Sequence, residues 1–237
     1  MTWSGTFHFG DTYAAYFGPS DENDQHQHAA YQIVLSSEQE ASIIDELGVE
    51  WRGSRLLIRP LVPHAVTSEA ELTLLYLDPQ SKLALDLADH AAPHDIAELP
   101  EAVLPFHSDA DPMSILAVLK EFATPPAASL DKRLIGALGD LAMNPGTLSV
   151  SEAAQRYGIS DGRLRTLARE QFGVPISTWL IWRKLERASR ELVAGAPLAD
   201  AAQAGGFSDQ AHFSRTMRRM FGVTPKSAMH SLNRIDH

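Results

Sequence analysis

Two segments in the C-terminal half of the chain repeat one pattern, and this repeat limits the fold more than any other feature. The segments are SEAAQRYGISDGRLRTLAREQFGV, residues 151–174, and ADAAQAGGFSDQAHFSRTMRRMFGV, residues 199–223. Each contains Ala-Ala-Gln, a glycine, an apolar residue, Ser-Asp, a stretch of helical periodicity and Phe-Gly-Val. Two copies of one helical unit therefore occur in this half of the chain.

Each copy has the plan of a helix-turn-helix. An alanine lets two helices approach each other, and Gly158 or Gly206, four residues later, permits the positive φ of a tight turn. An apolar residue then packs into the core. Ser160 and Ser208 are predicted to cap the second helix of each unit.

The second helix of each copy carries a face that suits the major groove of DNA. The inner face is expected to hold Leu164, Leu167 and Ala168 in the first copy and Phe213, Met217 and Met220 in the second. Small residues and arginines form the outer face, namely Gly162, Arg165, Thr166, Arg169, Ala211, Ser214, Arg215 and Arg218. Arginine binds the O6 and N7 atoms of guanine with two hydrogen bonds, and small side chains allow close approach. The alternative, solvated arginines without a ligand, explains less well why both copies share the pattern.

The charge of the chain is divided between its two parts. Residues 1–130 hold 20 acidic and 5 basic side chains, whereas residues 131–237 hold 10 acidic and 15 basic ones. An acidic module joined to a basic one fits phosphate contact by the basic part. Chance segregation of solvated faces is the other interpretation of composition alone.

Between the copies lies ISTWLIWRKLERASRELVAGAP, which we interpret as one long helix. Its predicted apolar stripe consists of Leu180, Ile181, Leu185, Ala188 and Leu192. Such a helix would hold the two units at a fixed separation. Units about one turn of DNA apart, ~34 Å, could bind two successive major-groove segments.

These residues carry a resemblance to a known family. The stretch from about Ser149 to Pro225, above all WRKLERASRELV and PLADAAQAGGFSDQAHFSRTMRRMFGVTP, resembles the DNA-binding domain of the AraC/XylS family of bacterial transcription regulators. The resemblance implies an all-α domain with a first helix-turn-helix at about residues 149–173, a linker helix at about 176–194 and a second helix-turn-helix at about 197–222.

The resemblance also assigns base-reading positions, which fall on Gly162, Arg165, Thr166, Gln210, Ala211, Ser214 and Arg215. Arg163, Arg169 and Arg218 complete the predicted DNA-binding set. Two departures stand out. Gly162 removes a side chain and costs up to ~1 kcal/mol of helix stability. After the final proline the chain has KSAMH instead of the usual aromatic-basic pair.

The N-terminal half has a different texture. AYQIVLSS, SRLLIRP and LTLLYLD are short β-rich runs, which predict a small β-barrel or sandwich. Helices are expected near residues 80–91 and over Asp111–Ala123, and TPPAAS reads as a linker. We therefore predict an α+β protein of two domains: a cupin-like β-barrel sensor with flanking helices at 1–123, a linker at 124–129, and a homeodomain-like pair of helix-turn-helix units, joined by a long helix, at 130–237.

Histidines in the expected barrel resemble a cupin metal pattern, with a departure. HQHAAYQIVLSS would place His26, His28 and Gln32 on one face of a strand, and His64 follows in RPLVPHAV. Gln32 stands where the cupin pattern has an acidic residue. Three alternatives remain open: a divalent metal (zinc, nickel or iron) on His26, His28 and His64, a metal-free effector pocket at His28, Gln32 and His64, or no small ligand.

Two further groups in this half have structural interpretations. The aromatic residues near the N-terminus, Trp3, Phe7, Phe9, Tyr13, Tyr16 and Phe17, are expected to form core or lid packing rather than a ligand box. The acidic run around Asp21–Asp24 is expected to be solvated.

The sequence favours a cytoplasmic, ligand-responsive transcription regulator that is not an enzyme. There is no cysteine, the N-terminus lacks a secretory pattern, and no apolar run is long enough for a membrane span. The expected partners are double-stranded DNA, RNA polymerase and a small-molecule effector, with no membrane. The Asp111–Ala123 helix would serve either in a homodimer or in packing on the barrel. The alternatives are a cupin-type metalloenzyme with a DNA-binding appendage and an anti-activator that acts through protein contacts.

Overall fold

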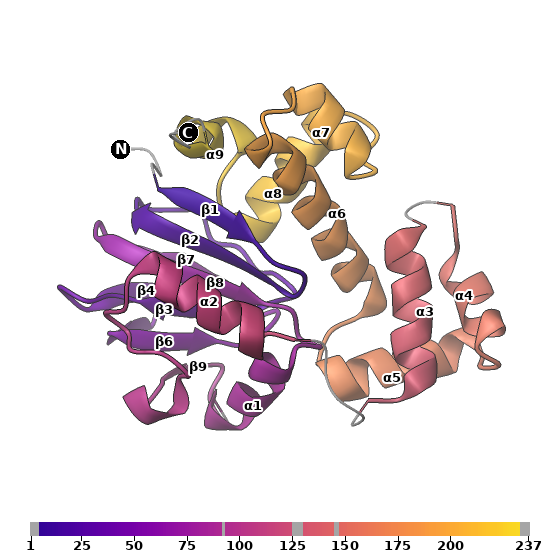
Figure 1. The fold of residues 1–237 in the computed structure, drawn as a ribbon, viewed down its shortest axis with the longest axis horizontal. Helices are drawn as coiled ribbons and strands as arrows, with labels where there is room; N and C mark the ends of the chain where they lie inside the picture. Colours follow the sequence, from indigo (N-terminus) through magenta and orange to yellow (C-terminus); the bar gives the residue numbers. More distant parts are fainter. Residues whose placement is uncertain (1–4, 92, 125–129, 145–146, 233–237) are drawn as a thin grey trace.

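The chain folds into a β domain followed by a helical domain (Figure 1). The computed structural model describes residues 5–91, 93–124, 130–144 and 147–232. Strands come first and helices later, which confirms the predicted two-domain α+β class. Residues 125–129 of the predicted linker, and Trp3, lie outside the described residues.

Two antiparallel sheets form the β domain. The larger has the order β1-β2-β8-β3-β6-β9, and the smaller has the order β5-β4-β7. The bounds are β1 Thr6–Phe9, β2 Tyr13–Pro19, β3 Tyr31–Leu35, β4 Ala41–Asp45, β5 Glu50–Gly53, β6 Arg55–Ile58, β7 His64–Val66, β8 Glu71–Leu77 and β9 Ile96–Glu98. The three β-rich runs predicted from the sequence are β3, β6 and β8, which lie side by side in the larger sheet.

The alternation of side chains in the larger sheet separates two cores. In β8, Leu74 and Tyr76 face the smaller sheet and the helical domain, whereas Leu75 and Leu77 face the opposite side. Helices α1 (Lys82–Ala91) and α2 (Pro112–Phe122) supply residues to the core on that opposite side. Both faces of the sheet are thus covered.

The two predicted helices of the β domain are confirmed. In α2, the Asp111 side chain accepts hydrogen bonds from the backbone N–H groups of Met113 and Ser114. Ile115 and Leu119 are fully buried, so the inner face of α2 packs on the sheet. A short 3-10 helix, η1 (Glu101–Val103), precedes α2.

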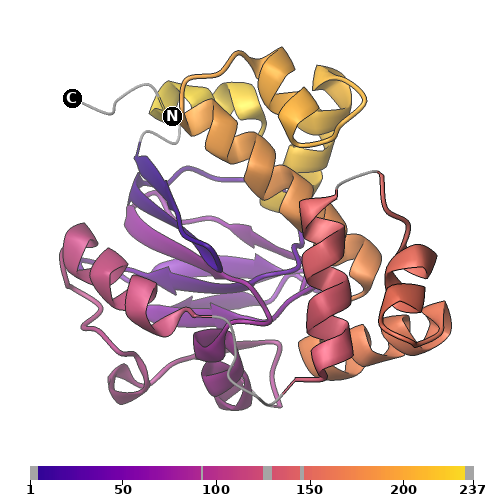
Figure 2. The same cartoon turned by 45° about the vertical axis from the view of Figure 1, so that its right-hand side comes forward.

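Seven helices follow in the described part of the chain. They are α3 Lys132–Met143, α4 Val150–Arg156, α5 Asp161–Phe172, α6 Ile176–Val193, α7 Leu198–Ala204, α8 Gln210–Phe221 and α9 Pro225–Leu232. Helix α6 connects the two helical units and packs against both of them (Figure 2). None of the helices among the described residues is long and apolar enough to cross a membrane.

The apolar stripe of α6 is centred differently from the prediction. Trp179 and Trp182 are buried together with Leu185, whereas Leu180 and Ile181 are only half-buried. The reason is that α6 contacts two surfaces: the helical domain and, through Trp182, the Tyr76 ring of the β domain at 6.0 Å between centroids. One core therefore continues from the sheet into the helical domain.

Candidate DNA-binding surface and its contacts with the β domain

The first helix-turn-helix consists of α4 and α5. A capping box links Ser149 and Glu152 at the start of α4. Gly158 makes the turn with φ of 66°, and the Ser160 side chain caps α5 by accepting from the Arg163 N–H. These local contacts aim one face of α5 at the core and leave the other free.

The faces of α5 are divided as the sequence predicted. Leu164, Leu167 and Ala168 are buried. The predicted DNA-binding residues of this helix are all exposed, namely Gly162, Arg163, Arg165, Thr166 and Arg169.

The second helix-turn-helix consists of α7 and α8, and its cap corrects the prediction. Gly206 makes the turn with φ of 76°. The N-cap is Asp209 rather than Ser208: its carboxylate accepts from the His212 N–H at 2.6 Å. The Ser208 hydroxyl instead bonds the side chains of Asp209 and His212. A charged cap binds a helix N-terminus more strongly than a hydroxyl does.

The inner face of α8 is buried as expected, through Phe213, Met217 and Met220. Of the predicted contact residues, Ser214 is half-buried and the others are exposed, namely Gln210, Ala211, Arg215 and Arg218. Both second helices therefore present the predicted residue types to solvent.

Three of the exposed arginines are held by carboxylates. Arg165 pairs with Asp161 at 2.9 Å and Arg163 with Glu170 at 3.4 Å, both within α5. Arg218 pairs with Asp24 at 2.5 Å, across the domain boundary. Arg169 and Arg215 form no ion pair with the described residues. Exposed pairs of this kind are weak, and a phosphate can replace the carboxylate.

The two units lie toward opposite ends of α6 (Figure 1). Helix α6 has 18 residues and is therefore about 27 Å long. Burial of Trp179, Trp182 and Leu192 fixes this helix against its neighbours. The exposed helices α5 and α8 are thus both packed against one buried connecting helix.

The loop of residues 21–24 contacts the C-terminal end of α8, while its acidic side chains Glu22 and Asp24 stay exposed as expected. Besides the Arg218 ion pair, the Asp24 N–H donates to the Gly222 carbonyl at 3.1 Å, and the Asn23 side chain donates to the Phe221 carbonyl at 3.3 Å. The hydrogen bond from Arg218 lowers the pKa of Asp24. The carboxylate is drawn to Arg218, and the loop amides to carbonyls that a helix C-terminus leaves unpaired.

Arginines of α6 make a second contact between the domains. Arg183 pairs with Asp78 at the end of β8 at 3.4 Å, and Arg190 donates to the backbone carbonyls of Phe9 and Gly10. Glu186 holds both arginines, at 2.6 and 2.8 Å. The turn between β1 and β2 is therefore tied to the connector of the two units.

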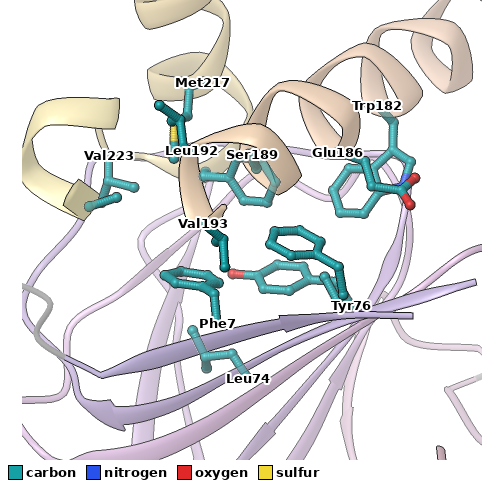
Figure 3. A pocket seen from close by; sticks show the side chains of 14 residues that line it. Phe7, Leu74, Tyr76, Trp182, Glu186, Ser189, Leu192, Val193, Met217 and Val223 are labelled. Atoms are coloured by element: carbon teal, nitrogen blue, oxygen red, sulfur yellow. The ribbon is translucent and has the colours of Figure 1, made fainter. Parts of the chain in front are cut away.

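An apolar cavity lies in the seam between the domains (Figure 3). It is lined from the β domain by Phe7, Phe9, Ala14, Leu74 and Tyr76, and from the helical domain by Trp182, Glu186, Ser189, Leu192, Val193, Met217, Phe221, Val223 and Ala228. Its volume is about 50 Å³. Ligand sites usually measure several hundred Å³, so the seam is nearly closed in this conformation.

The predicted histidine cluster is assembled, although not on one strand. The strand β3 begins only at Tyr31, and His26 and His28 lie in the preceding loop. The ring nitrogens Nε2 of His28 and His64 lie 2.8 and 2.9 Å from Gln32 Oε1. Backbone bonds between His26 and His64 bring the third ring alongside. The register of β3 places the Gln32 side chain in the interior. The loop before β3 can therefore bring His28 into contact with it.

Burial sets the protonation of these histidines. It lowers the pKa of His26 to about 3, helped by repulsion from His28, and it lowers the pKa of His28 and of His64. His28, Gln32 and His64 do not line the seam cavity, so their part in an effector site stays a prediction. The Tyr76 ring joins the two places, because it lines the cavity and lies 5.3 Å from the His28 ring.

Several residues of the seam were not identified from the sequence. Phe7 and Phe9 were interpreted only as packing, and Trp182, Asp78 and Glu186 were not selected at all. For Trp182 a signal exists, since Trp179, Trp182 and Leu185 recur at helical spacing. Asp78 ends a β-rich run and carries no local signal.

The chain is therefore a protein of the helix-turn-helix class. It has tandem units with exposed basic helices, and these units are held against a β domain. A family described as a helix-turn-helix domain matches residues 153–230. The chain is 28% identical to the transcriptional activator NphR of Rhodococcus sp over 149 residues, which cover 61% of this chain and 43% of NphR. It is 27% identical to the arabinose operon regulatory protein of Salmonella typhimurium over 111 residues, 46% of this chain and 39% of that protein. Residues 153–230 thus match a helix-turn-helix family, and the chain is similar over part of its length to transcription regulators of the AraC/XylS type.

The chain matches less than half the length of these two relatives. Solved structures are similar over nearly the whole chain. ToxT from Vibrio cholerae O395 has a TM-score of 0.58 at 12% identity, over 95% of this chain and 100% of that one. A structure of ToxT with an unsaturated fatty acid bound has a TM-score of 0.57 at 12% identity, over 97% and 99%. At this identity the likeness shows a shared fold.

Proposed function

We propose that this protein is a sequence-specific DNA-binding transcription regulator. One observation carries the proposal: α5 and α8 are exposed on the faces that hold small residues and arginines, and both are fixed to α6. With α6 about 27 Å long, the two helices can enter successive major-groove segments of double-stranded DNA. RNA polymerase is the expected partner on the promoter, and the cytoplasm the expected location.

The exposed side chains divide into two roles in this proposal. Arg165, Arg215 and Gln210 carry hydrogen-bonding groups that can discriminate between base edges. Arg163, Arg169 and Arg218 serve as phosphate contacts, which position the helices without reading sequence. Gly162, Ala211, Thr166 and Ser214 allow close approach.

The β domain is proposed to sense a small effector through the seam cavity. The lining is mainly aromatic and aliphatic, and its polar residues include Tyr76, Glu186 and Ser189. This composition suits an apolar or amphipathic molecule, and a relative in fold, ToxT, has been solved with an unsaturated fatty acid. Because the cavity holds only about 50 Å³, a ligand would have to part α6 and α8 from the sheet. Parting them would move the second recognition helix.

A homodimer through α2 is part of the proposal. The outer face of α2 carries Met113, which is 71% exposed, and Phe122, which is also exposed. Two such faces could pack against each other, whereas the inner face is already used by the sheet.

The test is binding of the purified full-length chain to DNA at several salt concentrations. A regulator of this design should bind with an affinity that falls steeply as salt rises, since each phosphate contact releases counterions. Arg215→Ala should cost about 1–3 kcal/mol at one base position and relax the preference there. Arg52→Ala, which removes an exposed arginine from β5 of the β domain, is the matched control and should change nothing. Equal loss on all sequences for Arg215→Ala would contradict base reading, and binding without salt dependence would contradict the proposal as a whole.

A further inference from the structure

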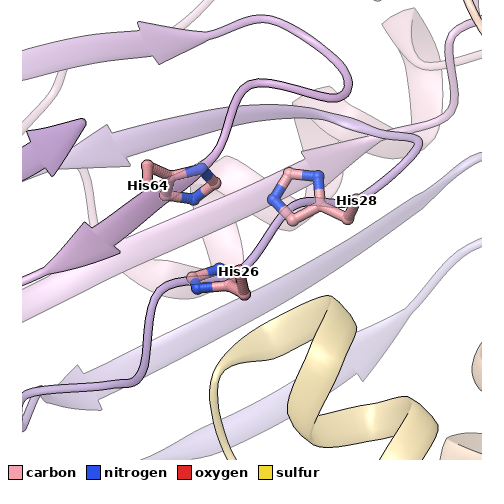
Figure 4. Close-up of side chains that lie close together, drawn as sticks. All are labelled: His26, His28 and His64. Atoms are coloured by element: carbon pink, nitrogen blue, oxygen red, sulfur yellow. The ribbon is translucent and has the colours of Figure 1, made fainter. Parts of the chain in front are cut away.

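Three histidine side chains meet in the interior of the β domain (Figure 4). His26, His28 and His64 retain 3%, 1% and 0% of their exposed surface. One nitrogen of each ring lies within 4.8 Å of one nitrogen of each other ring. His26 and His64 exchange two backbone hydrogen bonds of 2.9 Å, and the Leu61 N–H donates to the His28 carbonyl at 2.9 Å. Backbone hydrogen bonds therefore hold the three histidines in place.

The Nδ1 atom of each histidine donates a hydrogen bond to a backbone carbonyl. His26 Nδ1 lies 2.9 Å from the Asp24 carbonyl oxygen, His28 Nδ1 lies 3.0 Å from that of Ala30, and His64 Nδ1 lies 2.8 Å from that of Val62. A carbonyl oxygen can only accept, so each Nδ1 must carry the hydrogen. In a neutral ring the Nε2 atom is then an unprotonated acceptor.

None of the three Nε2 atoms faces a donor among the described residues, if the Gln32 amide is oriented as in the structure. Those of His28 and His64 lie against Gln32 Oε1, at 2.8 and 2.9 Å. His26 Nε2 is buried without any hydrogen-bond partner among the described residues. Four neutral lone-pair donors thus gather in the interior with no hydrogen between them, an arrangement that is unfavourable unless a cation lies among them.

Turning the Gln32 amide by 180° would relieve only part of the cluster without a cation. It would give N–H groups to His28 and His64, but His26 Nε2 would still lack a donor. A neutral imidazole with an unprotonated Nε2 atom is the form that binds metals.

We propose that His26, His28 and His64 bind a divalent late transition metal, with Zn²⁺ as the reference ion, through their Nε2 atoms, and that Gln32 Oε1 lies in the fourth position. Imidazole suits zinc, nickel, copper and iron. The three backbone carbonyls that hold Nδ1–H are the partners that orient metal-binding histidines. A tetrahedral zinc site needs nitrogens about 3.3 Å apart, so the rings must close from their present spacing.

Because all four ligands are neutral, the ion would keep its full charge in the interior. We therefore expect weaker binding than a site with a carboxylate would give, which makes the ion exchangeable. The backbone carbonyl of Asp24 orients His26, while the Asp24 carboxylate pairs with Arg218.

The histidine cluster lies close to residues that contact α8, so metal binding could affect α8. The residue that orients His26, Asp24, also pairs with Arg218, and the His28 ring lies 5.8 Å from Trp182 and 6.4 Å from Phe221. An ion on His26 would stiffen the loop that contacts the end of α8. This consequence for DNA rests on the proposed function, whereas the metal site does not.

The experiment is a titration of the metal-free full-length chain with Co²⁺, followed by displacement with Zn²⁺. The expected result is one ion per chain, with the intense visible absorption of four-coordinate Co²⁺, lost on adding Zn²⁺. Zn²⁺ should also raise the midpoint of thermal unfolding, since a ligand of the folded state stabilises it. Absence of this absorption, or no saturable binding, would overturn the site, whatever the DNA measurements show.

Variants identify the ligands. His64→Ala should weaken binding at least about 100-fold, whereas His107→Ala, which removes an exposed histidine, should leave it unchanged. Gln32→Glu supplies a carboxylate in the fourth position and should tighten binding, a gain that misfolding cannot produce. Binding that survives His64→Ala in a chain with unchanged circular dichroism, or that is lost in His107→Ala, would place the ion elsewhere and overturn the proposal.

Discussion

Arg218 is predicted to contact DNA, yet in this conformation its guanidinium is held by Asp24 of the β domain. Both side chains are more than half exposed, so the pair is weak and reversible. A DNA phosphate would compete with the carboxylate for the same donor. The contact can therefore lower DNA affinity without preventing binding.

Replacing Asp24→Asn should raise the DNA affinity of the full-length chain by a few-fold, because Arg218 is released and one negative charge is removed. Glu22→Gln removes the same charge from the same loop without touching Arg218, and should have a smaller effect. In an Arg218→Ala background the gain from Asp24→Asn should shrink to that of Glu22→Gln, because only the charge effect remains. Binding titrations at one salt concentration compare wild type with the four variants, and an equal gain in the Arg218→Ala background would show that the ion pair plays no part.

At the scale of elements, the two recognition helices end alike but meet different surroundings. Gly173 and Gly222 both close their helices in the left-handed region, each with φ of 71°. A Cβ atom at Gly173 would meet nothing within 4 Å, whereas one at Gly222 would lie 2.3 Å from the Asp24 carbonyl oxygen. Gly222 is needed for the domain contact as well as for the turn.

Gly173→Ala and Gly222→Ala form a matched pair of variants. Each should lose about 1–2 kcal/mol of stability through left-handed strain. Only Gly222→Ala should also push the loop of residues 21–24 away from α8. Chemical denaturation measures the shared cost, and hydrogen exchange at Asp24 measures the loop. Equal protection of the Asp24 amide in both variants would refute the contact.

The elements also show which parts of the site can be predicted from the sequence. The turn at Gly158, the cap at Ser160 and the inner faces of α5 and α8 depend on neighbours a few residues away, and these predictions are confirmed. The spacing of His28 and Gln32 predicts that they are neighbours, but on one strand, whereas His28 approaches Gln32 from the loop before β3. Asp24 and Arg218 are 194 residues apart, and only the docking of the two domains brings them together. No local pattern predicts such a pair, nor the cavity that the same docking creates.

For the whole molecule, the seam is the feature that can connect a signal to DNA. One continuous core crosses it, and the ion pair of Asp78 with Arg183 lies at its edge. Burial raises the pKa of the Asp78 carboxyl to about 6, although Arg183 opposes the shift; Glu186 also raises it. The buried charge of Asp78 is a cost that the folded chain bears at neutral pH.

The free energy of unfolding of the chain should depend on pH because Asp78 titrates. An unfolded aspartate titrates near pH 3.9. Between about pH 4 and pH 6 the folded chain therefore binds more protons at Asp78 than the unfolded chain does. Its free energy of unfolding falls progressively as pH rises through this range. Asp78→Asn removes the effect. Relative to wild type, this variant should gain on the order of 2–3 kcal/mol in free energy of unfolding from pH 4 to pH 7. Urea denaturation across this range tests it, and parallel profiles would contradict the assignment.

Reading of DNA by two helices is tested by selecting genomic DNA fragments with the purified full-length chain and footprinting those retained. We expect discrete sites with two protected major-groove segments about one turn apart on one face of the DNA. Arg169→Ala and Arg215→Ala should each weaken protection of a different segment, because they lie on different recognition helices. Uniform retention of all fragments, or a single protected segment that both variants weaken, would contradict a chain that reads DNA with two helices.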